Sequence, residues 1–171
     1  MTKMTKKEGV DPGDELPLLS GRILSLIFDK RYEDARSLIN QEQKRFSAGE
    51  AHRFMALAAV LHEYLGEIDE AIALMRKAVL ESPTWISHLY QLSVLLMDAK
   101  RWDDADLALS KLIALSLAQN EVYFISEARF RRAMCLKKLG RLTEFQQMNA
   151  EIPMGTRVFI GDKSCRIEDV T

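Results

Sequence analysis

A short pattern recurs four times along the chain and constrains its fold more than any other feature. Each copy is a large apolar residue, two residues that are mostly acidic, and then alanine in three of the four cases. The copies start at 32, 68, 102 and 142 and end on Ala35, Ala71, Ala105 and Phe145, which are 36, 34 and 40 residues apart. Acidic residues stabilise the first turn of a helix, and a small residue lets a second helix approach closely. The pattern therefore predicts helical repeats of about 34 to 40 residues.

Helical spacing of apolar residues supports this interpretation from residue 16 to about 139. A serine at 47 followed by Glu50 is the spacing of a capping box. Only four prolines and eight glycines interrupt the 171 residues, which favours helix. We predict helices over 16–28, 32–45, 48–65, 69–81, 85–99, 103–116, 121–139 and 143–151.

The repeats resemble the tetratricopeptide repeat family. The best match is residues 52–85, where Tyr64–Ile72 is followed by Ala78 and Pro83 at the spacing of the family. The next unit keeps the 34-residue period but has Lys100 where the family prefers glycine, and the two outer units are degenerate. The resemblance covers about residues 16–153. It implies an all-α array of antiparallel helical hairpins wound into a right-handed superhelix.

The end of the chain has a different pattern. Residues 156–160 and 163–167 are typical of two short strands, and Gly161-Asp162 suits the tight turn between them. A lone hairpin is marginal in water, so we expect it to cap the exposed apolar side of the last helices. The expected organisation is a flexible arm over 1–14, a repeat domain over 15–153 and a β-hairpin cap over 154–171.

Composition and charge exclude several classes of protein. The chain has 24 Lys and Arg against 25 Asp and Glu, whereas a dedicated nucleic-acid binder is strongly basic. No apolar stretch approaches the ~20 residues of a membrane span, and no signal-peptide core follows the first lysines. Cys135 and Cys165 form neither a disulfide framework nor a zinc motif. We expect a cytoplasmic protein that binds neither nucleic acid nor membranes.

We find no residue pattern that indicates catalysis. His52, His62 and His88 lack metal-ligand spacing, and no phosphate-binding glycine loop is present. The acidic pairs recur at helix starts, so a structural role explains them better than acid–base chemistry. We therefore predict no enzyme activity, cofactor or metal. A basic group over 129–141 is interpreted as a solvated helix face, with a patch for an acidic partner as the alternative.

The family resemblance also implies a concave surface lined by the first helix of each hairpin. A Lys and Asn clamp for acidic C-terminal peptides is absent, because Ala56, Val60, Tyr90 and Val94 occupy the matching positions. Aromatic and methionine side chains are enriched in the cores of interfaces. The candidate partner-binding residues are Tyr64, Tyr90, Val94, Met97, Phe130 and Met134, with Lys137 and Lys138 orienting an acidic flank.

Two function classes follow from this surface. The first is a non-catalytic adaptor or chaperone-like module that binds a protein or peptide in the groove. The second is a structural subunit that self-associates as a homodimer through the same surface or through an edge at Trp85 and Trp102. Size and architecture are similar to type III secretion translocator chaperones, and a toxin-neutralising partner is another version of the first class. The N-terminal arm is an alternative occupant of the groove.

Overall fold

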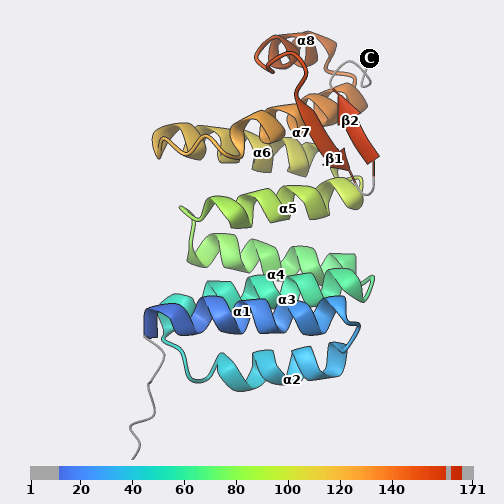
Figure 1. The fold of residues 1–171 in the computed structure, drawn as a ribbon. Coiled ribbons are helices and arrows are strands. Elements are labelled where there is room, and N and C mark those ends of the chain that lie inside the picture. The colour runs from blue at the N-terminus through green and yellow to red at the C-terminus, as the bar shows by residue number, and fades with distance from the viewer. Residues whose placement is uncertain (1–11, 161–162, 167–171) are drawn as a thin grey trace, which may run out of the picture.

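The computed structural model describes residues 12–160 and 163–166. Eight α-helices and a short 3-10 turn in this part of the chain precede a two-stranded antiparallel sheet. The elements stack along one axis from α1 and α2 to α8 and the strands (Figure 1). Their bounds are α1 (Pro12–Phe28), α2 (Tyr32–Glu42), η1 (Ala48–Glu50), α3 (Ala51–Tyr64), α4 (Ile68–Glu81), α5 (Ile86–Asp98), α6 (Trp102–Ala118), α7 (Ile125–Lys138), α8 (Leu142–Ala150), β1 (Arg157–Ile160) and β2 (Lys163–Arg166).

The repeated pattern acts at the start of α2, α4, α6 and α8. Its three alanines, Ala35, Ala71 and Ala105, are fully buried where the two helices of each hairpin meet. Phe145, in the fourth copy, is only half-buried and packs against the C-terminal core. The small residue therefore allows close helix packing in three hairpins, as predicted from the repeat.

The four turns inside the hairpins share one geometry. Lys30, Gly66, Lys100 and Gly140 each have a positive φ, between 58° and 79°. The amide that follows each of them donates to a carbonyl five residues earlier, at 2.8 to 2.9 Å. This left-handed ending satisfies helix carbonyls that lack a partner within the helix. Two lysines adopt it although glycine does so without steric cost.

Two details differ from the predicted helix starts. The first helix begins at Pro12, inside the range expected for the arm, because proline suits the first position of a helix. Residues 1–11 lie outside the described residues. The prediction of a capping box was wrong. Ser47 makes no side-chain cap bond, because a 3-10 turn lies between it and α3. Glu50 instead contacts Arg53 at 3.4 Å.

The hairpin closes the C-terminal end of the array. Its register pairs Val158 with Cys165 and Ile160 with Lys163, which agrees with the predicted strands, and the turn at 161–162 lies outside the described residues. Val158 is buried against Phe130, Met148 and neighbouring side chains of α7 and α8. The hairpin thus covers an apolar surface that a further repeat would otherwise bury.

No helix in the described part of the chain combines the length and the apolar character that crossing a membrane requires.

Candidate functional site: the concave groove

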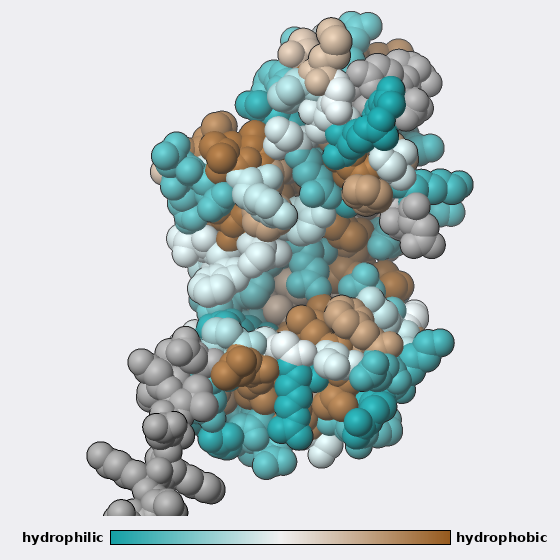
Figure 2. All heavy atoms as spheres, viewed as in Figure 1, coloured by the Kyte–Doolittle hydropathy of each residue, from teal (hydrophilic) through white to brown (hydrophobic). Residues whose placement is uncertain are grey.

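A groove with a volume of about 790 Å³ runs across α1, α3, α5 and α7. These are the first helices of the four hairpins, as the family resemblance implied. Figure 2 shows the molecule hollowed between α1 and the end formed by α7 and the hairpin. Its lining is mainly apolar and aromatic, with few charged groups. The residues that line it are Ser20, Leu24, Phe28, Arg53, Ala56, Leu57, Val60, Glu63, Tyr64, Trp85, Ser87, His88, Tyr90, Gln91, Val94, Tyr123, Phe124 and Arg131.

Two groups of aromatic rings stand at opposite ends of this groove. Phe28 and Tyr64 are in contact, with ring centroids 5.5 Å apart, and are 58% and 48% exposed. At the other end Tyr123 and Tyr90 each contact Phe124 at 5.0 Å, and Tyr123 is 80% exposed. Because large aromatic side chains gain from desolvation, such exposure in a hollow is typical of an interaction surface.

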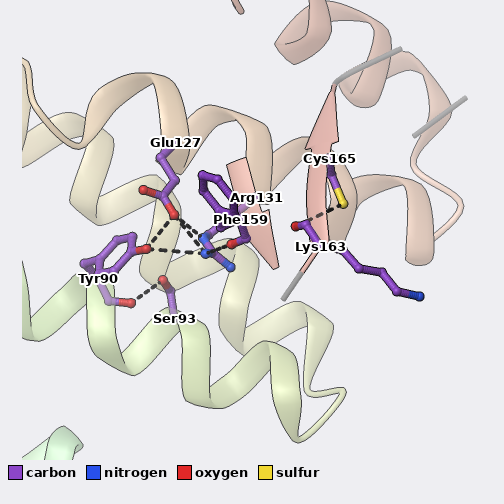
Figure 3. A network of polar contacts seen from close by, with 7 residues as sticks. All are labelled: Tyr90, Ser93, Glu127, Arg131, Phe159, Lys163 and Cys165. Atoms are coloured by element: carbon purple, nitrogen blue, oxygen red, sulfur yellow. Dashed lines mark hydrogen bonds and ion pairs between the residues drawn. The ribbon is translucent and has the colours of Figure 1, made fainter. Parts of the chain in front are cut away.

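A polar network positions Tyr90 in the groove (Figure 3). The Tyr90 hydroxyl donates to Glu127 Oε1 at 2.5 Å, and the buried Arg131 donates to the same oxygen through Nε and Nη2 at 3.0 and 2.8 Å. Arg131 Nη2 also donates to the Phe159 carbonyl at 3.0 Å. Burial and the hydrogen bond to Glu127 raise the pKa of Tyr90 to about 12. Arg131 therefore connects the groove wall on α5 and α7 to the capping hairpin.

The floor of the groove near Trp85 holds a second set of contacts. His52 and His88 lie in a buried hydrogen bond, with Nδ1 of one 2.8 Å from Nε2 of the other. The Trp85 ring stacks on His88 with centroids 5.8 Å apart, and the guanidinium of Arg53 lies 5.7 Å from the Trp85 centroid. The contacts of His52 and His88 are therefore packing contacts between α3, α5 and Trp85.

The structure divides the predicted partner-binding residues into two groups. Tyr64, Tyr90 and Val94 line the groove. Met97 does not, because it is buried in the central core. Phe130 was also wrongly placed: it is fully buried, since the hairpin and α8 cover that face of α7.

The remaining candidates, all on α7, are also absent from the groove lining. Met134 is half-buried and packs against both the central and the C-terminal cores. The Lys137 ammonium lies 5.8 Å from the centroid of the Phe145 ring, on the side of α8. Lys138 is exposed at the C-terminal end of α7. The residue of α7 that does reach the groove is Arg131, which the sequence analysis did not select.

Three exposed aromatic residues of the groove were not among the predicted partner-binding residues, although Trp85 was named in the edge for self-association. Phe28 is the last residue of α1, Trp85 immediately precedes α5, and Tyr123 lies in the connection between α6 and α7. Helical periodicity does not orient residues at or beyond the ends of helices. The available signal was a large aromatic residue next to a helix boundary.

The basic group over 129–141 is largely engaged in internal ion pairs. Arg132 and Arg141 both donate to the buried Asp106 at 2.7 Å, which links α6 and α7 to the start of α8. Arg129 pairs with Glu151, and Arg131 pairs with Glu127 as described above. These contacts favour a structural role for the group over a patch for an acidic partner.

The groove holds none of the usual constellations of catalysis within the described residues. No cluster of three or more His, Cys, Asp or Glu in that part of the chain is suited to a metal ion. Burial raises the pKa of the Cys135 thiol to about 12, so the thiol is neutral and weakly nucleophilic at neutral pH.

A second, smaller hollow of about 260 Å³ lies over α4, α5 and α6. Leu80 and Leu107 are exposed beside it, and an ion pair between Arg76 and Asp104 bridges α4 to α6 at 2.9 Å. This hollow contains no aromatic ring and has a third of the volume of the groove. The groove is therefore the stronger candidate for a binding site.

Comparison with known proteins gives the fold an independent test. No family model matches the chain, and no curated protein matches it. Solved structures share its architecture at low sequence identity, and three of them illustrate the likeness. MamA (MSR-1) is 19% identical with a TM-score of 0.57, and the match covers 77% of this chain and 71% of that chain. Aspartyl phosphate phosphatase F from Bacillus subtilis is 16% identical with a TM-score of 0.69, and the match covers 84% and 40%.

The third is a kinesin light chain protein of Podosopora anserina with nearly identical TPR-like repeats. It is 13% identical with a TM-score of 0.67, and the match covers 84% of this chain and 75% of that chain. Likeness at this level of identity establishes the fold alone. Together with the stacked hairpins, it confirms that the chain has the fold of a tetratricopeptide repeat array with a short C-terminal hairpin.

Proposed function

We propose that this tetratricopeptide-type repeat domain is a non-catalytic interaction module that binds a peptide or protein segment in its concave groove. The observation that carries the proposal is the exposure of Phe28, Tyr64 and Tyr123 around one hollow of about 790 Å³. Aromatic anchors in a hollow are the residues that most often dominate binding energy in interfaces. Tyr64, Tyr90 and Val94 remain the predicted contact residues.

The role of the other predicted residues changes in this proposal. Phe130 and Met97 shape the groove from within the core and do not touch the partner. Lys137 lies over Phe145 of α8 and Lys138 is exposed at the end of α7, and neither lines the groove, so this proposal assigns them no contact with the bound segment. The described residues that line the groove include no lysine or asparagine.

A groove variant with a matched control tests this function. Tyr64→Ala/Tyr123→Ala removes exposed rings only, so the fold is retained. Leu142→Ala removes an exposed apolar side chain far from the groove. We expect affinity capture with the wild-type protein to retain one partner, the control to retain it as well, and the groove variant to lose it. The purified partner should then bind the groove variant at least about tenfold more weakly in calorimetry, because truncating one hot-spot residue typically costs 2 kcal/mol or more.

Self-association is the alternative function, and sizing of the purified protein distinguishes it. A stable dimer that dissociates in Tyr64→Ala/Tyr123→Ala would show that a second copy occupies the groove. A monomer whose partner binds both variants equally would contradict the groove as the binding site. The exposed leucines beside the smaller hollow would then be the next surface to substitute.

A further inference from the structure

Two carboxylates lie beside the apolar part of the groove. Glu63 lines it directly and precedes Tyr64 on α3. Asp98 is one helical turn beyond Val94, at the end of α5. Both therefore sit at the end of the groove where Phe28 and Tyr64 are exposed.

Neither carboxylate has a hydrogen bond or an ion pair with any other residue that the structure describes. Burial raises the pKa of Glu63, and the neighbouring Asp98 raises it further. Burial also raises the pKa of Asp98, which Arg131 partly offsets. Glu63 is half-buried and Asp98 is exposed, and no cation is in direct contact with either, although Arg131 acts on Asp98 from a distance. A cation bound between the two carboxylates would relieve the repulsion between them.

The cations of the groove are engaged elsewhere. Arg131 donates to Glu127 and to the Phe159 carbonyl. Arg53 contacts Glu50 at 3.4 Å and lies over the Trp85 ring. The charge that is available to a ligand in the groove is therefore negative and is located at the Tyr64 end.

We propose that the segment bound in the groove carries an apolar side chain followed by a lysine or arginine, and that Glu63 and Asp98 bind this cation. This inference rests on the proposed function. The apolar side chain packs on Val60 and Val94, which lie one turn from Glu63 and Asp98 respectively. The exposed ring of Tyr64 contacts the cation or its aliphatic stem, since aromatic faces attract lysine and arginine.

A peptide selection tests this specificity without knowledge of the natural partner. The probe is a displayed library of random 12-residue peptides, selected on the full-length wild-type protein at neutral pH. We expect the selected peptides to share a lysine or arginine at a constant distance from an apolar residue. Fluorescence anisotropy then gives the affinity of one labelled peptide from this set for each variant.

Glu63→Gln/Asp98→Asn keeps the shape of both side chains and removes their charge. We expect it to bind the peptide about tenfold more weakly and to lose most of the salt dependence of binding. A peptide in which methionine replaces the lysine or arginine should bind the wild-type protein about tenfold more weakly than the original peptide does. It should bind the variant as tightly as the original peptide binds the variant. Glu70→Gln/Asp103→Asn, two exposed carboxylates at helix starts, should bind as the wild type does.

The outcomes separate this inference from the proposed function. Peptides that lack a shared cation, or that bind Glu63→Gln/Asp98→Asn as tightly as the wild type, overturn the inference. If those peptides are still weakened by Tyr64→Ala/Tyr123→Ala, the groove function stands without it. A failure to select any peptide, or equal binding to all variants, overturns both. A dimer that dissociates in Glu63→Gln/Asp98→Asn would assign the cation to a second copy and overturn the peptide as occupant.

Discussion

His52 Nδ1 lies 2.8 Å from His88 Nε2 in a buried contact that joins α3 to α5. One of the two nitrogens donates a hydrogen and the other accepts it, so the bond requires at least one neutral ring. Trp85 packs on both imidazoles and shields them from one side. This pair therefore connects the second and third hairpins at the floor of the groove, and its protonation is linked to folding.

The histidine pair predicts a loss of stability in mild acid. Burial lowers the pKa of His88 to about 4, with smaller effects of His52 and Arg53, and burial also lowers the pKa of His52. Both values lie below the ~6.5 of an unfolded histidine, so the unfolded chain takes up protons first as the pH falls. The stabilisation that the neutral histidine pair contributes to the fold is complete above about pH 6.5 and decreases towards pH 4. The free energy of unfolding then falls by at most about 1.4 kcal/mol per pH unit for each histidine.

Urea unfolding between pH 7.5 and pH 4.5 measures this effect. The double variant His52→Leu/His88→Leu removes both titrating rings and keeps an apolar contact in their place. We expect its free energy of unfolding to depend less on pH over this range than that of the wild type. The carboxylates Glu50 and Glu81, which also act on His52, remain in both proteins. Equal slopes in the two proteins would exclude the histidines as the source.

Phe130→Ala should destabilise the fold instead of acting on the groove alone. Its ring is fully buried among α7, α8 and Val158, and truncation of a buried phenylalanine costs about 3–5 kcal/mol. The exposed Tyr64 provides the comparison, since Tyr64→Ala should change the free energy of unfolding by less than about 1 kcal/mol. Thermal unfolding monitored by circular dichroism measures both. A Phe130→Ala protein as stable as Tyr64→Ala would contradict the assigned burial.

Lys100→Gly should stabilise the protein. Lys100 has φ +58° in the turn between α5 and α6, where a side chain with a Cβ is strained and glycine is not. Glycine loses more conformational entropy on folding, which offsets part of this relief of strain. We expect a net gain of about 0.5–1 kcal/mol in the free energy of unfolding. Denaturant midpoints measure the gain. The control is Lys111→Gly on the exposed face of α6, which should destabilise by about 1 kcal/mol because its backbone is helical.

Arg131→Met should release the capping hairpin. The substitution removes the donor to the Phe159 carbonyl and both bonds to Glu127, which leaves a half-buried carboxylate with only the Tyr90 hydroxyl. We expect a loss of about 3 kcal/mol in the free energy of unfolding. Amide hydrogen exchange of residues 157–160 should accelerate more than that of α4. Arg129→Met, which breaks the more exposed pair with Glu151, is the matched control and should leave the strands protected.

The sequence by itself determined the repeat architecture. The buried alanines, the acidic helix starts and the 34-residue spacing act within one hairpin, so local physics predicts them from sequence. The same holds for β1 and β2, two short strands that are close together in the sequence. Helix starts were less accurate, because a 3-10 turn after Ser47 and the proline at residue 12 shift them by a few residues.

Only the tertiary structure decided which residues of the groove helices are accessible. Phe130 and Tyr64 both have the helical spacing of a groove residue, yet Phe130 is covered by the hairpin and α8, while Tyr64 stays exposed at the end of α3. Trp85 and Tyr123 come from connections, where no periodicity predicts orientation. The contact between His52 and His88 spans 36 residues and forms because stacking brings α3 and α5 together. Burial and long-range pairing depend on how the hairpins pack, and a pattern within one repeat does not contain that information.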